Sequence, residues 1–166
     1  MTEAQLVEAL AQALLAAGHM ACTAESCTGG RIAGACTDLA GSSQWFERGF
    51  VTYSNQAKTE MLGVPAALIT AHGAVSEPVA LAMADGALRH AQAQWSVAVT
   101  GVAGPGGGSP DKPVGTVWLA WGHRRADGSV RCQAERVLFD GDRAQVRAGT
   151  VRSALAGLVQ RVHLWS

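Results

Sequence analysis

The sequence predicts one α/β domain, with a mixed β-sheet and helices on both faces of it. Helix-like and strand-like stretches alternate through the first hundred residues, which is typical of parallel strands joined by helices. Asp127-Gly128 stands between two further strand-like stretches and predicts a hairpin that adds antiparallel strands to the sheet. The 166 residues are 48% hydrophobic, and neither a linker nor an internal repeat divides them. One core and one domain, residues 1–166, are therefore expected.

The expected elements follow from periodicity and from helix-capping residues. Leu6, Leu10 and Leu14 recur at helical spacing before Gly18, which is a typical helix end. Ser76-Glu77-Pro78 begins a later helix, with Ser76 as the cap. Helices are expected at 2–17, 31–39, 56–62, 65–71, from 77 and at 143–163, and strands at 20–24, 46–53, 95–100, 114–121 and 130–139.

Composition excludes several classes of function. Thirteen basic residues balance thirteen acidic ones and no Lys/Arg run occurs, so we expect no nucleic-acid partner. No apolar run of about 20 residues predicts a membrane span, and no signal peptide is recognisable. The four cysteines form no Cys-x-x-Cys pair, so we expect no metal site. Free thiols and the absence of a targeting segment predict a cytoplasmic protein.

The stretch Thr23 to Gly30 carries the densest chemistry. It joins a strand to a helix and holds a hydroxyl, a thiol, a carboxylate and two glycines. Ser26 is a candidate nucleophile, and the backbone N–H groups of Thr28, Gly29 and Gly30 are candidate donors to an oxyanion. A helix cap with a tight turn is the alternative interpretation. No Gly-x-Ser-x-Gly motif and no histidine in a catalytic-looking loop support a Ser-His-Asp triad.

Two other loops follow strands and are expected at the same edge of the sheet, where ligands of α/β proteins gather. The first contains Tyr53 and Lys58. Lys58 is a candidate base if burial lowers its pKa, and otherwise a solvated helix lysine. Tyr53 could relay a proton or stand free in water.

The second loop runs from Thr100 to Pro110 and is rich in glycine, including Gly101 and Gly104. Its backbone could approach a ligand closely and bind an anion, or it could be a long flexible turn. Arg143, at the start of the last helix, could bind a phosphate or pair with Asp140 or Asp142.

Several segments, taken in their order and spacing, resemble one family. They include Ala24-Glu25-Ser26-Cys27-Thr28-Gly29-Gly30, Val51-Thr52-Tyr53-Ser54-Asn55, Val99-Thr100-Gly101-Val102-Ala103-Gly104-Pro105 and Gly141-Asp142-Arg143. The family is the CinA C-terminal domain, also called the PncC-type nicotinamide mononucleotide amidases. The resemblance spans about residues 4 to 160, without the N-terminal domain of the fused members, as in the stand-alone form.

The resemblance implies a three-layer α/β/α domain, usually dimeric, that needs no metal or cofactor. It implies hydrolysis of nicotinamide mononucleotide to nicotinate mononucleotide and ammonia, in pyridine-nucleotide salvage or metabolite clearance. It implies a serine–lysine mechanism with a supporting tyrosine at Ser26, Lys58 and Tyr53, and substrate binding at Thr100, Gly101 and Arg143. Two alternatives remain: a non-catalytic nucleotide-binding or regulatory module, and a hydrolase with Cys27 as the nucleophile.

Overall fold

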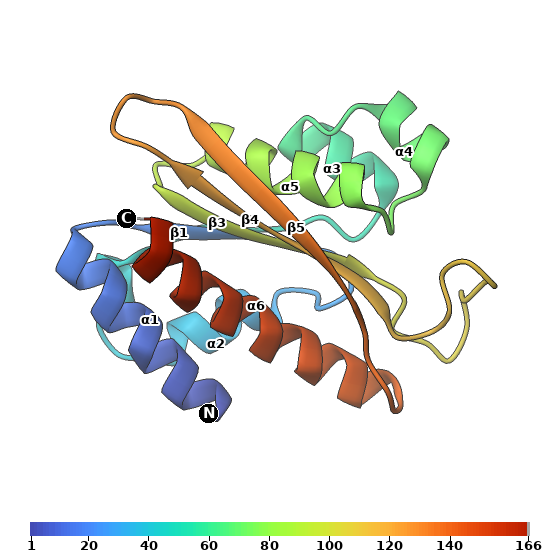
Figure 1. The fold of residues 1–166 in the computed structure, drawn as a ribbon, viewed down its shortest axis with the longest axis horizontal. Helices are drawn as coiled ribbons and strands as arrows, with labels where there is room; N and C mark the ends of the chain where they lie inside the picture. Colours follow the sequence, from blue (N-terminus) through green and yellow to red (C-terminus); the bar gives the residue numbers. More distant parts are fainter. Residues whose placement is uncertain (166) are drawn as a thin grey trace.

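The computed structural model describes residues 1–165 and has three layers, with a five-stranded sheet between two sets of helices (Figure 1). The strands are β1 (Ala21–Glu25), β2 (Phe46–Val51), β3 (Trp95–Gly101), β4 (Thr116–Arg124) and β5 (Val130–Leu138). The helices are α1 (Glu3–Ala17), α2 (Arg31–Thr37), α3 (Asn55–Leu62), α4 (Ala66–His72), α5 (Glu77–Arg89) and α6 (Arg143–Trp165), with a short 3-10 turn at Ser42–Gln44. The predicted α/β class and the expected order of elements are confirmed.

The sheet is mixed, in the order β2-β1-β3-β4-β5. β1 runs parallel to both β2 and β3, whereas β4 and β5 add in antiparallel orientation. The carboxyl ends of the three parallel strands therefore lie at one edge of the sheet. The loop from Val102 to Gly115 extends from this same edge, because it joins the end of β3 to the start of β4 (Figure 1).

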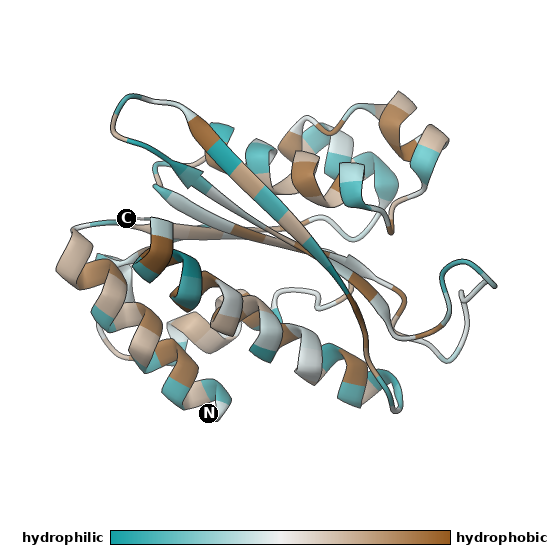
Figure 2. Cartoon of the chain, in the orientation of Figure 1, coloured by the Kyte–Doolittle hydropathy of each residue, from teal (hydrophilic) through white to brown (hydrophobic). Residues whose placement is uncertain are grey.

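Each face of the sheet has its own apolar core. α1, α2 and α6 cover one face, with Leu10, Leu14 and Leu155 fully buried. α3, α4 and α5 cover the other face, with Leu62, Met83 and Leu88 buried. β1 is buried along its whole length, which explains its short run of small residues, whereas polar and apolar residues alternate along the outer strand β5 (Figure 2).

Two glycines allow helices to approach their neighbours closely. A Cβ at Gly157 of α6 would overlap the ring of Trp121 on β4, and a Cβ at Gly86 of α5 would overlap the Leu62 carbonyl of α3. Both helices thus depend on a residue without a side chain for their distance from the neighbouring element, which is β4 for α6 and α3 for α5.

Helix capping differs from expectation at one position. Thr2 and Gln5 form a capping box on α1, and Asp142 accepts a bond from the Gln145 amide on α6. Ser76, expected as the side-chain cap of α5, instead donates its hydroxyl to the Gly73 carbonyl at 2.8 Å. The Gly73 carbonyl precedes the helix, so this bond closes the α4–α5 connection and does not cap α5.

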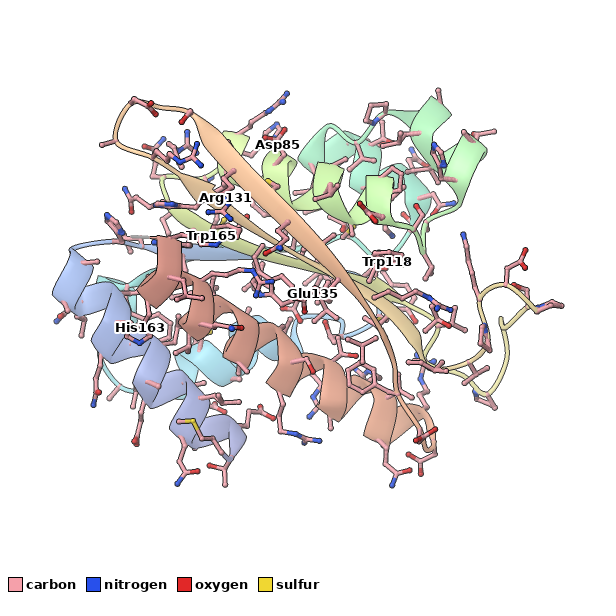
Figure 3. All side chains as sticks on the ribbon, in the orientation of Figure 1. Asp85, Trp118, Arg131, Glu135, His163 and Trp165 are labelled. Atoms are coloured by element: carbon pink, nitrogen blue, oxygen red, sulfur yellow. The ribbon has the colours of Figure 1, made fainter. Side chains whose placement is uncertain are left out.

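The hairpin edge carries an aromatic and cationic cluster. The His123 ring stacks on Trp95 at 3.8 Å, and the guanidinium of Arg131 lies 4.0 Å from the ring of Trp165, which Figure 3 labels together with Glu135. This cluster joins β3, β4 and β5 to the end of α6. None of the helices within residues 1–165 is both long and apolar enough to cross a bilayer.

Candidate active site

A cavity of about 300 Å³ opens where the three parallel strands end. The turn after β1, the segment after β2, the loop after β3 and the first turn of α6 all contribute to its wall. Seven of the residues predicted from sequence line it: Ser26, Tyr53, Lys58, Thr100, Gly101, Gly104 and Arg143. Asn55 also lines it and was not predicted, because an asparagine at a helix start is indistinguishable from a capping residue in sequence.

Lys58 and Ser26 are in direct contact at the base of the cavity. The Lys58 side chain is buried, and its Nζ donates to Ser26 Oγ at 3.1 Å and to the Thr52 carbonyl at 2.9 Å. Ser54 caps α3 by accepting from the Ala57 amide at 3.0 Å, which places Lys58 in the first turn of that helix. The lysine thus reaches the serine from an adjacent strand end.

The charge of Lys58 is not neutralised by a carboxylate. No salt bridge to Lys58 occurs within residues 1–165. Burial without an opposite charge disfavours the ammonium form and lowers the pKa of Lys58 from its ordinary value of 10.5. The alternative of a solvated helix lysine is therefore wrong.

The turn after Ser26 is shaped by backbone bonds and by glycines. The Ser26 amide donates to the Val99 carbonyl at 3.1 Å, and the Gly29 amide donates to the Ser26 carbonyl at 3.0 Å. Gly29 and Gly30 have φ values of +59° and +102°, in the left-handed region that favours glycine. Thr28, Gly29 and Gly30 do not line the cavity, and the Gly29 amide is already occupied within the turn.

Two charged residues hold this turn in place. Glu25 is buried, and its carboxylate accepts from the Thr28 hydroxyl at 2.6 Å and from the Ile32 and Ala33 amides. Arg147 donates from Nε to the Cys27 carbonyl and from Nη2 to the Thr28 carbonyl, both at 3.1 Å. Neither role was predicted. The position of Glu25 before the turn was a usable signal, whereas Arg147 is separated by 120 residues.

Tyr53 and Arg143 form the outer wall of the cavity. Tyr53 is 61% exposed, and its hydroxyl accepts from Arg143 Nη2 at 3.2 Å. Arg143 Nη1 donates to the Gly104 carbonyl at 3.0 Å. Within the described chain Arg143 pairs with neither Asp140 nor Asp142, so its charge is free for a ligand.

The remaining candidates contribute less. Cys27 lines the cavity, but burial raises the pKa of its thiol to about 11, which leaves little thiolate at neutral pH. Thr100 lines the cavity and donates its hydroxyl to the Ala74 carbonyl at 3.0 Å. Among residues 1–165, no cluster of three or more His, Cys, Asp or Glu side chains could hold a metal ion.

Comparison with known proteins identifies the family of this chain. Residues 3–162 match the model of the CinA C-terminal domain. This chain belongs to that family. It is 54% identical to the nicotinamide-nucleotide amidohydrolase PncC of Escherichia coli K12 over 157 residues, 95% of this chain and 93% of that protein. It is 61% identical to the protein of the same name from Pseudomonas putida over 138 residues, 83% of each chain.

Solved structures with a similar fold agree with this assignment. The crystal structure of competence damage-inducible protein A from Klebsiella pneumoniae superposes on this chain with a TM-score of 0.93 at 40% identity. The superposition covers the full length of both chains. The expected family membership and three-layer fold are thus confirmed.

Proposed function

We propose that this chain is an amidohydrolase that converts nicotinamide mononucleotide to nicotinate mononucleotide and ammonia through an acyl-enzyme on Ser26. The observation that carries the proposal is the 3.1 Å contact between Lys58 Nζ and Ser26 Oγ in a cavity lined by glycine backbone and Arg143. A serine is inert at its own pKa and needs a base within hydrogen-bond reach. A buried lysine with a lowered pKa supplies that base.

Acylation begins when neutral Lys58 takes the Ser26 hydroxyl proton. The Ser26 Oγ attacks the carboxamide carbon, and the carbonyl oxygen becomes a tetrahedral oxyanion. Backbone N–H groups of the turn after Ser26 stabilise that oxyanion, an effect worth roughly 3 kcal/mol per donor. Lys58 then returns the proton to the amide nitrogen, and the C–N bond breaks. Ammonia departs, and the acyl group remains as an ester on Ser26.

Deacylation reverses the roles of the same groups. Lys58 takes a proton from water, the hydroxide attacks the ester carbon, and Ser26 leaves as its proton returns. The carboxylic acid so formed gives its proton to the released ammonia or to water, and nicotinate mononucleotide leaves as a carboxylate. Tyr53 assists the proton transfer to the leaving amide nitrogen, and its hydroxyl is held in place by the bond it accepts from Arg143.

The substrate phosphate supplies orientation. Arg143 presents a guanidinium without a carboxylate partner in the described chain, and it lies beside the glycines of the loop after β3. A phosphate bound to Arg143 and to Thr100, Gly101 and Gly104 would hold the far end of the substrate while the amide reaches Ser26.

The test is ammonia release from nicotinamide mononucleotide by the wild type and by Ser26→Ala. We expect turnover in the wild type and none above background in Ser26→Ala. Ser153→Ala, a half-buried serine on α6, is the matched control and should retain full activity. Full activity in Ser26→Ala would exclude Ser26 as the nucleophile, and loss of activity in Cys27→Ala alone would favour the cysteine.

A non-catalytic nucleotide-binding module remains the alternative, because Arg143 and the glycine loop would serve binding equally well. It predicts thermal stabilisation by nicotinamide mononucleotide without ammonia release. The formed Ser26–Lys58 contact favours catalysis, since a binding module has no need for a buried, unpaired lysine beside a serine.

The cellular setting belongs to the same proposal. We expect a cytoplasmic homodimer that acts in pyridine-nucleotide salvage on a small-molecule nucleotide, without a cofactor. Light scattering coupled to size exclusion tests the dimer, with the 17.1 kDa chain as the monomer reference. A single monomeric species at micromolar concentration would contradict it.

A further inference from the structure

Arg147 on α6, a half-buried arginine outside the cavity, hydrogen-bonds to the backbone of the turn that carries Ser26. Its Nε and Nη2 donate to the consecutive carbonyls of Cys27 and Thr28, both at 3.1 Å. Arg147 is not among the residues that line the cavity, so it has no route to touch the substrate. Its two bonds thus act on the turn alone.

The orientation of a peptide carbonyl also fixes the amide of the same peptide. In a trans peptide the C=O and N–H point in opposite directions. The Gly29 amide holds the Ser26 carbonyl, which fixes the Cys27 N–H, and Arg147 holds the Cys27 carbonyl, which fixes the Thr28 N–H. Both of these N–H groups are therefore held in fixed directions immediately after the nucleophile.

The amides of Cys27 and Thr28 differ in what they can reach. Within residues 1–165, neither amide donates to another residue, and the Cys27 amide contacts its own thiol. Cys27 lines the cavity whereas Thr28 does not, so the Cys27 amide is the one next to a bound substrate. The Gly29 amide is occupied by the Ser26 carbonyl, so it is not a second donor.

We propose that Arg147 is a positioning residue that holds the turn after Ser26, so that the amide of the cavity-lining Cys27 donates to the oxyanion. Glu25 fixes the other side of the turn through the Thr28 hydroxyl and the α2 amides. Arg147 acts directly on the two carbonyls that follow the Ser26–Cys27 peptide, and its planar fork matches two consecutive carbonyls better than a lysine could. This inference rests on the proposed function and identifies an oxyanion donor for it.

The experiment compares kcat and KM of Arg147→Ala, Arg147→Lys and Arg152→Ala with nicotinamide mononucleotide. Arg152 is an exposed arginine of the same helix and serves as the matched control. Arg147→Ala should lower kcat about 10- to 100-fold with little change in KM, below the roughly 10²- to 10³-fold loss for removing an oxyanion donor outright. Arg147→Lys should be intermediate and Arg152→Ala normal. A melting scan of each variant checks folding, and Arg147→Lys keeps the test decisive if Arg147→Ala unfolds.

A second substrate separates oxyanion positioning from general loosening. The thioamide analogue of nicotinamide mononucleotide develops charge on sulfur, which fits an oxyanion site poorly. The wild type should prefer the oxygen substrate, and Arg147→Ala should lose much of that preference. An unchanged oxygen-to-sulfur ratio with an unchanged kcat would overturn the proposal, as would an equal loss on both substrates.

Failure of the proposed function is recognised separately. If the wild type releases no ammonia, the rate of Ser26 labelling by a fluorophosphonate still tests Arg147, because phosphorus also develops an oxyanion. Slower labelling of Arg147→Ala than of Arg152→Ala would support the positioning role on its own. Equal rates, or no labelling of wild-type Ser26, would overturn it.

Discussion

Two buried basic side chains, Lys58 and Arg161, lie in opposite parts of the molecule and differ in their surroundings. Arg161 on α6 donates to Glu135 at 2.9 Å and to Gln133 at 3.1 Å, and its guanidinium lies 3.7 Å from the ring of Trp121. Lys58 donates only to a hydroxyl and to two backbone carbonyls.

The difference distinguishes a basic side chain that stabilises the fold from one that is suited to catalysis. Arg161 has a carboxylate, an amide and an aromatic face as partners for its guanidinium. Lys58 has neutral acceptors alone, and burial makes its ammonium form costly, so its pKa is lowered. Lys58 also contacts Ser26, so its neutral form is placed to take the hydroxyl proton.

The largest expected effect is on turnover. Lys58→Met should lower kcat by about 10³-fold or more, because it removes the base that activates Ser26. Arg161→Met should leave kcat within about threefold of the wild type, since its side chain lies away from the cavity. Ammonia release measures both. Comparable losses in the two variants would break the distinction.

The next effect is on the free energy of unfolding, which substitutions of Arg161 and of Lys58 should change in opposite directions. Arg161→Met should lower the free energy of unfolding by about 2 kcal/mol through lost cation–π and charged hydrogen bonds. Lys58 binds its proton more weakly in the folded state than in the unfolded state. The free-energy cost of burying its ammonium group is therefore full at low pH, and it disappears as the pH rises through the pKa of the unfolded state. Relative to the wild type, Lys58→Met should therefore be most favoured at acidic pH, and denaturant titrations at several pH values measure this. If the difference in the free energy of unfolding between Lys58→Met and the wild type did not change with pH, this prediction would be contradicted.

The smallest effect sharpens the description of the catalytic side. Tyr53→Phe keeps the backbone carbonyl that accepts from Lys58 and removes only the hydroxyl bonded to Arg143. We expect roughly a tenfold fall in kcat, below the 10²- to 10⁴-fold range typical of general acid–base groups, because the hydroxyl assists a proton that Lys58 already delivers. Steady-state kinetics measure it, and wild-type kcat would remove Tyr53 from the mechanism.

Much of the fold was predictable because the local signals agree with the tertiary structure. The glycine after α1 and the Asp127-Gly128 turn lie at the boundaries where the sequence predicts them. Boundaries were less certain where tertiary bonds decide them. Strand β4 begins at Thr116, not Val114, because Val114 and Gly115 belong to the turn that closes the glycine loop.

The candidate site was predictable where one loop carries several signals and unpredictable where partners come from distant helices. Ser26, Tyr53 and Lys58 follow strands, so their convergence on the cavity followed from the parallel order. The burial of Lys58 did not follow, because nothing local in α3 distinguishes a buried lysine from a solvated one. Arg147 lies on a helix with other arginines, and only the folded chain brings it to the Cys27 carbonyl.

The most direct measurement of the central claim is the titration of the Lys58 side chain by NMR. Lys58 and Lys112 are the only lysines in the sequence, so side-chain labelling gives two signals, and the Lys112 signal serves as the reference. We predict that the Lys58 signal titrates below the ordinary lysine value of 10.5, and that kcat/KM rises with pH through the same midpoint. A Lys58 signal that titrates at or above 10.5 would show a permanently charged lysine at neutral pH, and would contradict its role as the base for Ser26.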